Sequence, residues 1–374
     1  MAERRLTILQ LLPSLISGGV ERGTLEVSRA ICQRGWRSLV MSAGGPMVTQ
    51  LAEHGAEHTI ADIGAKTPWV FRHILTLRKH IQRFNVDIVH ARSRLPAWLA
   101  IVALRGVNRQ HRPALITTVH GLNSVNRYSE VMTRGDAVIT VSKACQAYVL
   151  KHYPRCDPRR LHCVPRGVDP DYFHYGWRPQ TPWLACFRRR YPATLDGKII
   201  TLLGRITQRK GAGVLLRLVS SLNRQGTPSC GLIVGGAAAH HHKHLDDLHR
   251  QAAELGVSDR VVFTGPRDDV REIMSISDLV LSLSAKPESF GRSVLEALSL
   301  GRPVAGWAHG GVAEIMASLY PAGAVTPGDE AALAKCAQKL LTDPPAVPRR
   351  HGYTRARMLD STLALYESVL ASRL

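Results

Sequence analysis

The segment DLVLSLSAKPESFGRSVLEALSLGRPVAG, residues 278–306, contains two short apolar runs, LVLSL near its start and PVAG at its end. Between them, residues 291–300 form an amphipathic stretch of helical periodicity. Parallel strands need a long crossover between them, so this order predicts a strand, a helix and a second, parallel strand. Runs that are apolar on both faces further predict a sheet covered by helices on both sides.

The same alternation occurs in both halves of the chain. Helices are predicted at about 20–34, 211–224 and 244–255. The sequence therefore predicts an α/β fold with two doubly wound, Rossmann-like parallel sheets. The strand candidates are TILQLLP, SLVMS, VDIVH, ALITTVH, AVITVS and LHCVP in the first half, and KIITLLG, CGLIVGG, RVVFTG, DLVLSLS, RPVAG and AGAVTP in the second.

A length of 374 residues exceeds what one hydrophobic core usually supports, so two domains are expected. We place one domain at 1–180 and another at 181–352, on either side of a Pro- and Trp-rich stretch. A final helix, 353–374, is expected to pack back on the first domain. Ligands of parallel sheets bind beyond the carboxyl ends of the strands, so the cleft between the domains is the predicted site.

The positive charge is concentrated in the first half of the chain. Residues 1–190 carry 28 Lys and Arg against 12 Asp and Glu, whereas 191–374 carry 21 against 17. Such a field indicates an anionic partner: nucleic acid, an anionic bilayer or an acidic acceptor. A surface that is basic only for solubility is the alternative.

Two further features concern the compartment. The early apolar run LTILQLLP is much shorter than a membrane span of about 20 residues. Seven cysteines, an odd number without a CxxC pair, suggest neither a disulfide framework nor a zinc site. We therefore expect a cytoplasmic protein without a transmembrane helix.

Two glutamates in the opening segment suggest sugar binding. Glu296 lies in the apolar stretch SVLEALSL, where a charged carboxylate needs a hydrogen-bonding partner that a sugar diol could supply. Glu288 precedes the helix, beside the backbone N–H groups of Phe290 and Gly291. A ribose and a donor sugar on either side of a diphosphate would fit this arrangement.

Two turns between a strand and a helix suggest diphosphate binding. Gly18 and Gly19 let a backbone approach an anion at a helix N-terminus, although a tight turn without a ligand is as good an interpretation. Arg205 and Lys210 bracket the second turn, LLGRITQRKG, and add two cations to it. A surface Arg and Lys pair is the alternative here.

Seven motifs together resemble the retaining GT-B glycosyltransferases of family 4, including bacterial enzymes of lipopolysaccharide core assembly. The similarity extends from residue 6 to about 342. The two glutamates and the preceding arginine and lysine are its most specific part. The motifs are SGGVERGTLEVSRAICQRG, TVHG, AVITVSKA, VPRGVD, GRITQRKG, ESFGRSVLE and GGVAEI.

This resemblance implies roles for individual residues. Arg205 and Lys210 would hold the diphosphate, Glu288 would contact the donor sugar, and Glu296 would bind the ribose. Gly18 and Gly19 would face the donor phosphates or the acceptor. His120 in TVHG would lie near the reacting carbon, although a lone histidine after a strand can equally be a packed turn residue. The implied reaction is hexosyl transfer with retention, in which the leaving phosphate takes the acceptor proton.

Several arginines suggest the acceptor. Arg166 replaces the asparagine common in VPRGVD of the family, and Arg292 replaces an apolar residue. Arg92 and Arg94 follow a strand of the first domain, in HARSRLPAW. We expect Arg92, Arg94 and Arg166 to bind an acidic acceptor, with a solvated loop as the alternative for the first two.

The predicted partners are a nucleoside-diphosphate sugar, a phosphorylated or lipid-linked glycan, and the anionic inner face of the cytoplasmic membrane. No cofactor or metal is expected, because AHHHKH, 239–244, has no interleaved carboxylate. Two alternatives belong to other classes: a nucleic-acid-binding protein, and a catalytically silent sugar-nucleotide-binding protein. The basic residues are too dispersed to favour the first, and the intact set of Arg205, Lys210, Glu288 and Glu296 argues against the second.

Overall fold

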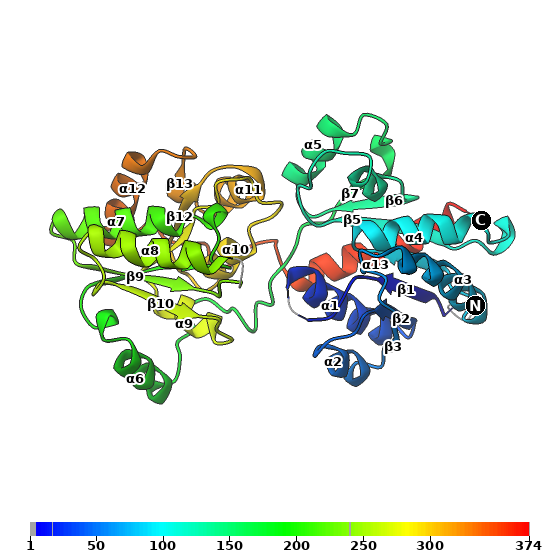
Figure 1. The fold of residues 1–374 in the computed structure, drawn as a ribbon, viewed down its shortest axis with the longest axis horizontal. Helices are drawn as coiled ribbons and strands as arrows, with labels where there is room; N and C mark the ends of the chain where they lie inside the picture. Colours follow the sequence, from blue (N-terminus) through cyan, green and yellow to red (C-terminus); the bar gives the residue numbers. More distant parts are fainter. Residues whose placement is uncertain (1–4, 17, 239–240, 374) are drawn as a thin grey trace. The chain divides into compact units, whose positions relative to one another are not determined.

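The computed structural model describes residues 5–16, 18–238 and 241–373, which form two compact units (Figure 1). Unit 1 comprises the chain up to Pro165 together with the C-terminal segment from Ala356, and unit 2 is Arg166–Arg355. The sequence analysis placed these boundaries at 180/181 and 352/353. The observed boundaries differ from the predicted ones because the two segments of chain that connect the units pair with each other. Val168 forms a parallel bridge with Thr354, and both residues belong to unit 2.

Unit 1 contains a seven-stranded sheet in the order β3-β2-β1-β4-β5-β6-β7, in which every neighbouring pair is parallel. Six of its strands were predicted from the sequence. The seventh, β3, was missed because its sequence, EHTI, contains no buried residue and no apolar run. The strands are β1 Thr7–Leu11, β2 Arg37–Ser42, β3 Glu57–Ile60, β4 Ile88–Ala91, β5 Ala114–Val119, β6 Ala137–Thr140 and β7 Leu161–Cys163.

The C-terminal helix belongs to the core of unit 1. Ile8, Ile88 and Ile116, on three neighbouring strands, pack in one cluster with Ile31 of α1 and Tyr366 of α13. Helices α1 and α13 therefore cover the same face of this sheet. The helices of unit 1 are α1 Gly19–Gln33, α2 Val48–Glu53, α3 His73–Arg83, α4 Arg94–Arg105, α5 Lys143–His152 and α13 Arg355–Ala371, with short 3₁₀ turns that include η1 Pro68–Arg72 and η3 Ser129–Thr133.

Unit 2 contains a six-stranded sheet in the order β10-β9-β8-β11-β12-β13, again with parallel pairing throughout. All six strands coincide with predicted apolar runs. The class predicted from the sequence, α/β with two doubly wound parallel sheets, is therefore confirmed. The strands are β8 Lys198–Leu203, β9 Ser229–Val234, β10 Val261–Gly265, β11 Leu279–Ser282, β12 Val304–Trp307 and β13 Ala324–Val325.

The helices of unit 2 begin and end within two residues of the predicted positions where a prediction was made. None of the described helices has the length and apolar composition that crossing a bilayer requires. The helices are α6 Thr181–Arg190, α7 Ala212–Arg224, α8 His242–Glu254, α9 Val270–Ile276, α10 Arg292–Ser299, α11 Gly310–Leu319 and α12 Glu330–Thr342.

The strand order identifies one position in each sheet where consecutive crossovers leave in opposite directions. We call this position the switch point. In unit 1 it lies between β1 and β4, and in unit 2 between β8 and β11. The helices that follow these two strands diverge, which leaves the carboxyl ends of the strands accessible to a ligand. Residues that follow β8 and β11 are therefore the first candidates for a site in unit 2.

Candidate functional site

The loop after β8 places two cations at the switch point of unit 2. Arg205 is exposed directly beyond the strand, and Lys210 ends a 3₁₀ turn before α7. Gly211 joins this turn to the helix with a φ of +81°, and a Cβ at that position would lie 2.5 Å from the carbonyl oxygen of Leu283. The glycine thus permits a close approach between the loops that follow β8 and β11.

The loop after β11 carries Glu288 to the same place. The Lys210 Nζ lies 2.6 Å from Glu288 Oε1, and the Ser284 hydroxyl donates to the same oxygen at 2.5 Å. The pair therefore spans the switch point, because its members follow the two strands that define it. Ser284 was not predicted as a site residue, although it ends the run DLVLSLS.

The environment keeps Glu288 ionised. Burial alone would raise the pKa of this carboxyl, but the charge of Lys210 and the hydrogen bonds from Lys210 and Ser284 outweigh that effect and hold the pKa below its usual value. The side chain keeps about a fifth of its surface exposed, at 18%. An ionised carboxylate with an exposed edge can accept hydrogen bonds from a polar ligand.

Two helix N-termini lie beside this ion pair. Gly291 precedes α10 with a φ of +96°, and a Cβ there would lie 2.8 Å from a methyl group of Val312. The side chain of Phe290 is buried, so only its backbone can contact a ligand. Helix α11 begins at Gly310, and the Gly311 N–H donates to the Glu288 carbonyl at 2.8 Å. Free N–H groups at such helix starts favour an anion.

His309 supports the same loop. Its Nε2 lies 2.9 Å from the carbonyl oxygen of Ser284, which ties the start of α11 to the chain before Glu288. The histidine was missed by the sequence analysis. Its signal was its position directly before the glycines of GGVAEI.

Glu296 has a partner within its own helix. The side chain is buried in α10, and Arg292 Nε donates to Glu296 Oε1 at 2.9 Å, one turn away. The sequence analysis assigned the balancing of this carboxylate to a sugar diol and regarded Arg292 as an extra positive charge for an acceptor. The structure instead pairs these two residues, so any ligand at Glu296 would share the carboxylate with Arg292.

In unit 1, the predicted glycine turn follows β1. Gly18 has a φ of +135° and caps α1, where its carbonyl accepts from the Arg22 N–H at 3.1 Å. Gly19 is exposed, and a Cβ there would meet no atom within 4 Å. His120 is half-buried directly after β5. The glycines lie at the switch point of this sheet, whereas His120 lies two strands from β1.

The two arginines after β4 differ in environment. Arg92 is 3% exposed, and its Nε donates to the side-chain oxygen of Gln10, on β1, at 2.8 Å. This buried hydrogen bond joins the end of β4 to β1, the two strands of the switch point. It is not in the solvated loop that was the alternative interpretation. Arg94 is half-buried, donates to the Ser129 hydroxyl at 3.1 Å and lies over the Tyr128 ring. Their predicted acceptor roles remain predictions.

Arg166 is half-buried in unit 2, in the segment between β7 and α6. Of the predicted site residues, the structure brings Lys210 and Glu288 into direct contact and places Glu296 beside Arg292. Gly18, Gly19, Arg92, Arg94 and His120 belong to unit 1.

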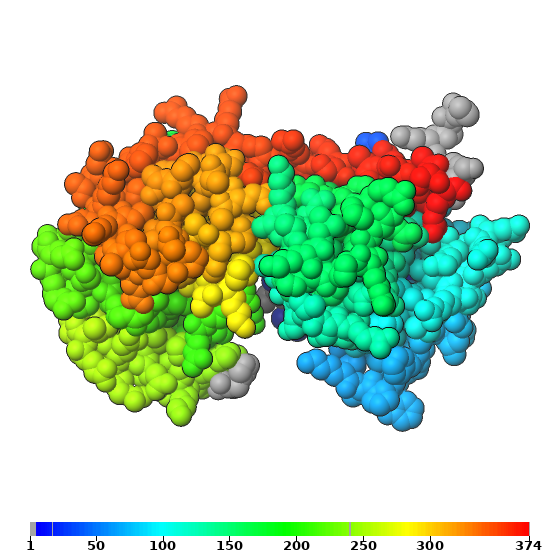
Figure 2. All heavy atoms as spheres, turned by 90° about the horizontal axis from the view of Figure 1, so that it is seen from above, coloured from blue at the N-terminus to red at the C-terminus, as the bar shows by residue number. Residues whose placement is uncertain are grey.

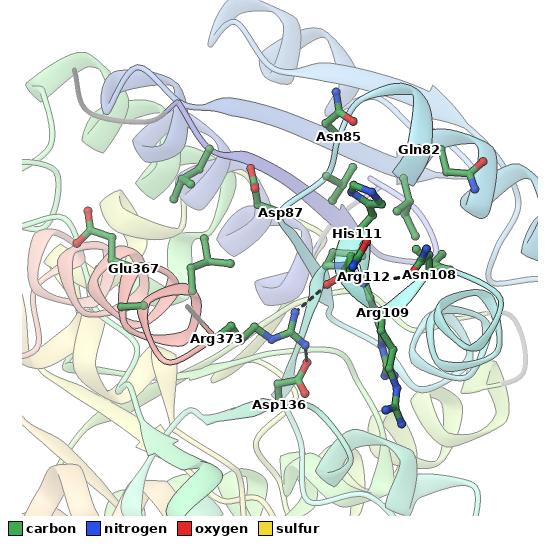
Figure 3. A pocket seen from close by; sticks show the side chains of 18 of the residues that line it. Gln82, Asn85, Asp87, Asn108, Arg109, His111, Arg112, Asp136, Glu367 and Arg373 are labelled. Carbon is green, nitrogen blue, oxygen red and sulfur yellow. Dashed lines mark hydrogen bonds and ion pairs between the residues drawn. The ribbon is translucent and has the colours of Figure 1, made fainter. Parts of the chain in front are cut away.

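A pocket of about 1360 Å³ opens in unit 1 beside the amino ends of the strands, away from the carboxyl ends that the predicted site residues follow (Figure 3). It is bordered by residues before β4, β5 and β6, such as Asp87, Arg112 and Asp136, and it contains none of the predicted site residues. Arg373 is already engaged there with Asp136 and the Arg112 carbonyl. Because volume alone does not define chemistry, we assign the site to the switch point of unit 2, where charged groups converge.

No cluster of three or more His, Cys, Asp or Glu that could hold a metal ion occurs in the described part of the chain. The first two residues of AHHHKH, 239–240, lie outside it. Whether the protein works without a metal or cofactor remains a prediction from the sequence.

Two sequence profiles match the chain. Glycosyltransferase Family 4 covers residues 17–172, and Glycosyl transferases group 1 covers residues 187–357. A relative, the D-inositol 3-phosphate glycosyltransferase of Stackebrandtia nassauensis, is 29% identical over 77% of this chain and 69% of its own length.

Solved structures show the same fold. A glycosyltransferase from Rickettsia africae superposes with a TM-score of 0.85 at 27% identity, over 98% of this chain and 99% of that one. The Anabaena protein Alr3699/HepE, in complex with UDP, superposes with a TM-score of 0.75 at 20% identity, over 98% and 96% of the two chains.

Proposed function

Because the chain combines a glycosyltransferase family 4 domain with a glycosyl transferases group 1 domain and is homologous to GT-B glycosyltransferases, we propose that it transfers a hexose from a nucleoside-diphosphate sugar. The acceptor in this proposal is a phosphorylated or lipid-linked glycan of the cell envelope, such as the lipopolysaccharide core. The observation that carries the donor part is the contact of Lys210 with Glu288 across the switch point of unit 2.

The donor would lie with its diphosphate at this switch point. Arg205 and Lys210 supply positive charge, and the N-termini of α7 and α10 supply backbone N–H groups. Glu288 would accept hydrogen bonds from hydroxyl groups of the transferred sugar, and Glu296 from the ribose. The UDP bound by the Anabaena protein supports a nucleotide in this kind of fold.

The proposed transfer retains the configuration of the anomeric carbon. The bond from that carbon to the β-phosphate oxygen breaks, and its electron pair leaves with the nucleoside diphosphate. The acceptor hydroxyl oxygen bonds to the same face of the carbon, and its proton moves to the departing phosphate oxygen. Arg205, Lys210 and the α10 N-terminus would stabilise the charge that develops on this oxygen, without having to rearrange.

The acceptor would approach unit 1. In this proposal Arg94 binds acidic groups of the acceptor, and Arg166, which belongs to unit 2, has the same role. Arg92 supports the neighbouring strands β1 and β4 through its hydrogen bond to Gln10, and His120 contacts the donor sugar. Gly18 and Gly19 leave space for phosphates or the acceptor. The excess of positive charge in residues 1–190 supports association with the anionic inner face of the cytoplasmic membrane.

The test is release of nucleoside diphosphate from purified protein. Thermal-shift screening against UDP-, GDP- and ADP-sugars would first identify the donor, and nucleotide release with envelope glycan fractions would then identify the acceptor. We expect one nucleotide to stabilise the protein and its sugar to appear on the acceptor with unchanged anomeric configuration. Stabilisation without transfer to any fraction would indicate a silent binding protein, and a product of inverted configuration would contradict retention.

A further inference from the structure

We infer that the segment Lys66–Arg83 of unit 1 docks on an anionic lipid bilayer. This inference rests on the proposed function, which places the protein at a membrane, and it adds the surface that makes the contact. We call this surface the α3 face and define it by Trp69, Phe71, Arg72, Leu75 and Lys79.

The α3 face exposes large apolar side chains. Trp69 is 77% exposed, Phe71 59% and Leu75 60%, and Ile60 at the end of β3 is 79% exposed. Tryptophan and phenylalanine gain much from burial, so a cluster of them in water marks a surface that binds something. Elsewhere in the described chain the exposed large apolar residues are more scattered along the sequence.

Helical periodicity separates this surface from the core. Val70, His73, Leu77 and Ile81 point into unit 1 and are buried. Phe71, Arg72, Leu75 and Lys79 recur at the intervals that share the opposite side of a helix. The exposed apolar residues are therefore not a part of the core left uncovered, because the core side of this segment is already filled.

The charge on the α3 face complements anionic lipid. Residues 61–84 contain five Lys and Arg and one acidic residue, Asp62. One of these cations, Arg78, donates to the carbonyls of Ala103 and Val102 and is not available to a partner. The other four, Lys66, Arg72, Lys79 and Arg83, are exposed. Apolar and aromatic side chains interspersed with lysine and arginine are typical of surfaces that lie at a lipid headgroup interface.

The topology places the aromatic end of the α3 face at the same edge of the sheet as the predicted acceptor residues of unit 1. The turn η1 follows β3, so Trp69 lies toward the carboxyl edge of the sheet, the edge from which the Gly18–Gly19 turn also leaves. Strand β4, which the predicted acceptor residues Arg92 and Arg94 follow, is three strands from β3, which at the usual spacing is about 14 Å. Figure 2 shows the light-blue part of the chain, which includes η1 and α3, projecting at the rim of unit 1. An acceptor held in the bilayer would therefore arrive at the working edge of this sheet.

The test is flotation of the full chain with vesicles of phosphatidylcholine, with and without phosphatidylglycerol. Two variants remove the proposed contacts: Trp69→Ser with Phe71→Ser, and Arg72→Glu with Lys79→Glu. Matched controls alter exposed residues of unit 2: Leu195→Ser, and Arg224→Glu with Lys335→Glu. We expect wild type to bind the anionic vesicles, each test variant to bind at least about tenfold more weakly, and the controls to stay within about twofold.

A second measurement does not depend on the serine variants folding. Brominated lipids should quench part of the fluorescence of the six tryptophans, and Trp69→Phe, which keeps an aromatic ring, should remove that part while the protein still floats. Equal quenching in Trp69→Phe, or test variants that float as well as wild type, would overturn the α3 face as the contact.

The inference can fail separately from the proposed transfer. Nucleotide affinity measured by calorimetry should be the same in all these variants, because the proposed donor site lies in unit 2. A wild-type chain that binds a nucleotide but no vesicle would overturn the inference and leave the donor site intact. Equal binding to neutral and anionic vesicles would also overturn it, since the four exposed cations would then contribute nothing.

Discussion

Arg292 and Glu296 form an ion pair within one turn of α10, with Arg292 Nε 2.9 Å from Glu296 Oε1. The glutamate side chain is 10% exposed and the arginine 29%, so the pair is mostly shielded from water. A carboxylate held in this way is fixed in position before any ligand arrives. In the proposed function it is the group that binds the ribose.

Glu296→Ala should therefore weaken binding of the donor nucleotide. Loss of a hydrogen bond to a charged group costs about 1.5–3 kcal/mol, which corresponds to roughly ten- to a hundredfold in affinity. Calorimetry with the nucleotide found by thermal shift measures it. Glu254→Ala, at an exposed position near the end of α8, is the control and should keep the wild-type affinity. Unchanged affinity in Glu296→Ala would contradict the ribose assignment.

Lys210→Ala should keep the fold and lower transfer by about a hundredfold or more. The lysine is proposed to stabilise charge on the departing phosphate, and loss of one such donor typically costs about 3–4 kcal/mol of barrier. Turnover of the purified variant checks this, with Lys243→Ala, in α8, as the control. Wild-type turnover in Lys210→Ala would remove the residue from the mechanism.

Acidification should weaken unit 2 through Glu288. Lys210 and Ser284 hold the pKa of this carboxyl in the folded protein below the usual value of 4.5. The ionised carboxylate therefore stabilises the fold fully at pH values above 4.5. This stabilisation is lost as the pH falls through the lower pKa of the folded state. Glu288→Gln cannot ionise, so the stability difference between wild type and this variant should shrink as the pH is lowered from 6 to 3.

Urea unfolding followed by hydrogen exchange in unit 2 peptides measures that difference. Glu254→Gln, on the exposed end of α8, should show no such dependence. A constant difference between wild type and Glu288→Gln across the range would mean that the lysine does not favour the ionised carboxylate.

Gly291→Ala should disturb the start of α10. The residue has a φ of +96°, and the added Cβ would lie 2.8 Å from a Val312 methyl group. Gly226→Ala is a matched control, because its φ is +77° but a Cβ there meets nothing within 4 Å. Both changes should cost about 1 kcal/mol through the backbone. Gly291→Ala should cost more stability than Gly226→Ala and should also weaken nucleotide binding. If the two variants lose the same stability and bind the nucleotide equally well, the close approach of Gly291 to α11 is unimportant.

The strands were predictable because parallel strands buried on both faces consist of continuous apolar residues. The edge strand β3 could not be predicted, because its own sequence, EHTI, has no apolar run. Its strand conformation depends on pairing with the neighbouring strand. Lys210 and Glu288 could be assigned to one site from their motifs, but the contact between them depends on the order of β8 and β11 in the sheet. Strand order is a property of the whole sheet and cannot be obtained from one strand sequence.

The partners of buried charges were the least predictable feature. From the sequence, a solvated loop was one interpretation of Arg92. In the structure it donates a buried hydrogen bond to Gln10 of β1, 82 positions away in the chain. Arg292 and Glu296 are only one turn apart, and their pairing was missed because a ligand was assumed to balance the glutamate. A buried ionisable residue on a predicted helix should therefore first be compared with residues three and four positions away.

Tyr366→Phe should loosen α13 from unit 1. The tyrosine hydroxyl lies 2.6 Å from His90 Nδ1, and His90 Nε2 lies 2.6 Å from the Thr118 hydroxyl, so one buried histidine joins the C-terminal helix to β4 and β5. Burial raises the pKa of Tyr366 to about 12, which keeps its proton available to this hydrogen bond at neutral pH. The phenylalanine would leave a histidine nitrogen unsatisfied in the core, at a cost of about 1–3 kcal/mol.

The loss should appear as faster hydrogen exchange in α13 and a lower unfolding free energy of unit 1. Tyr172→Phe, which removes a hydroxyl from a more exposed ring, should change neither. If Tyr366→Phe is as stable as wild type, apolar packing alone attaches the helix, and the hydrogen bond between Tyr366 and His90 contributes nothing measurable.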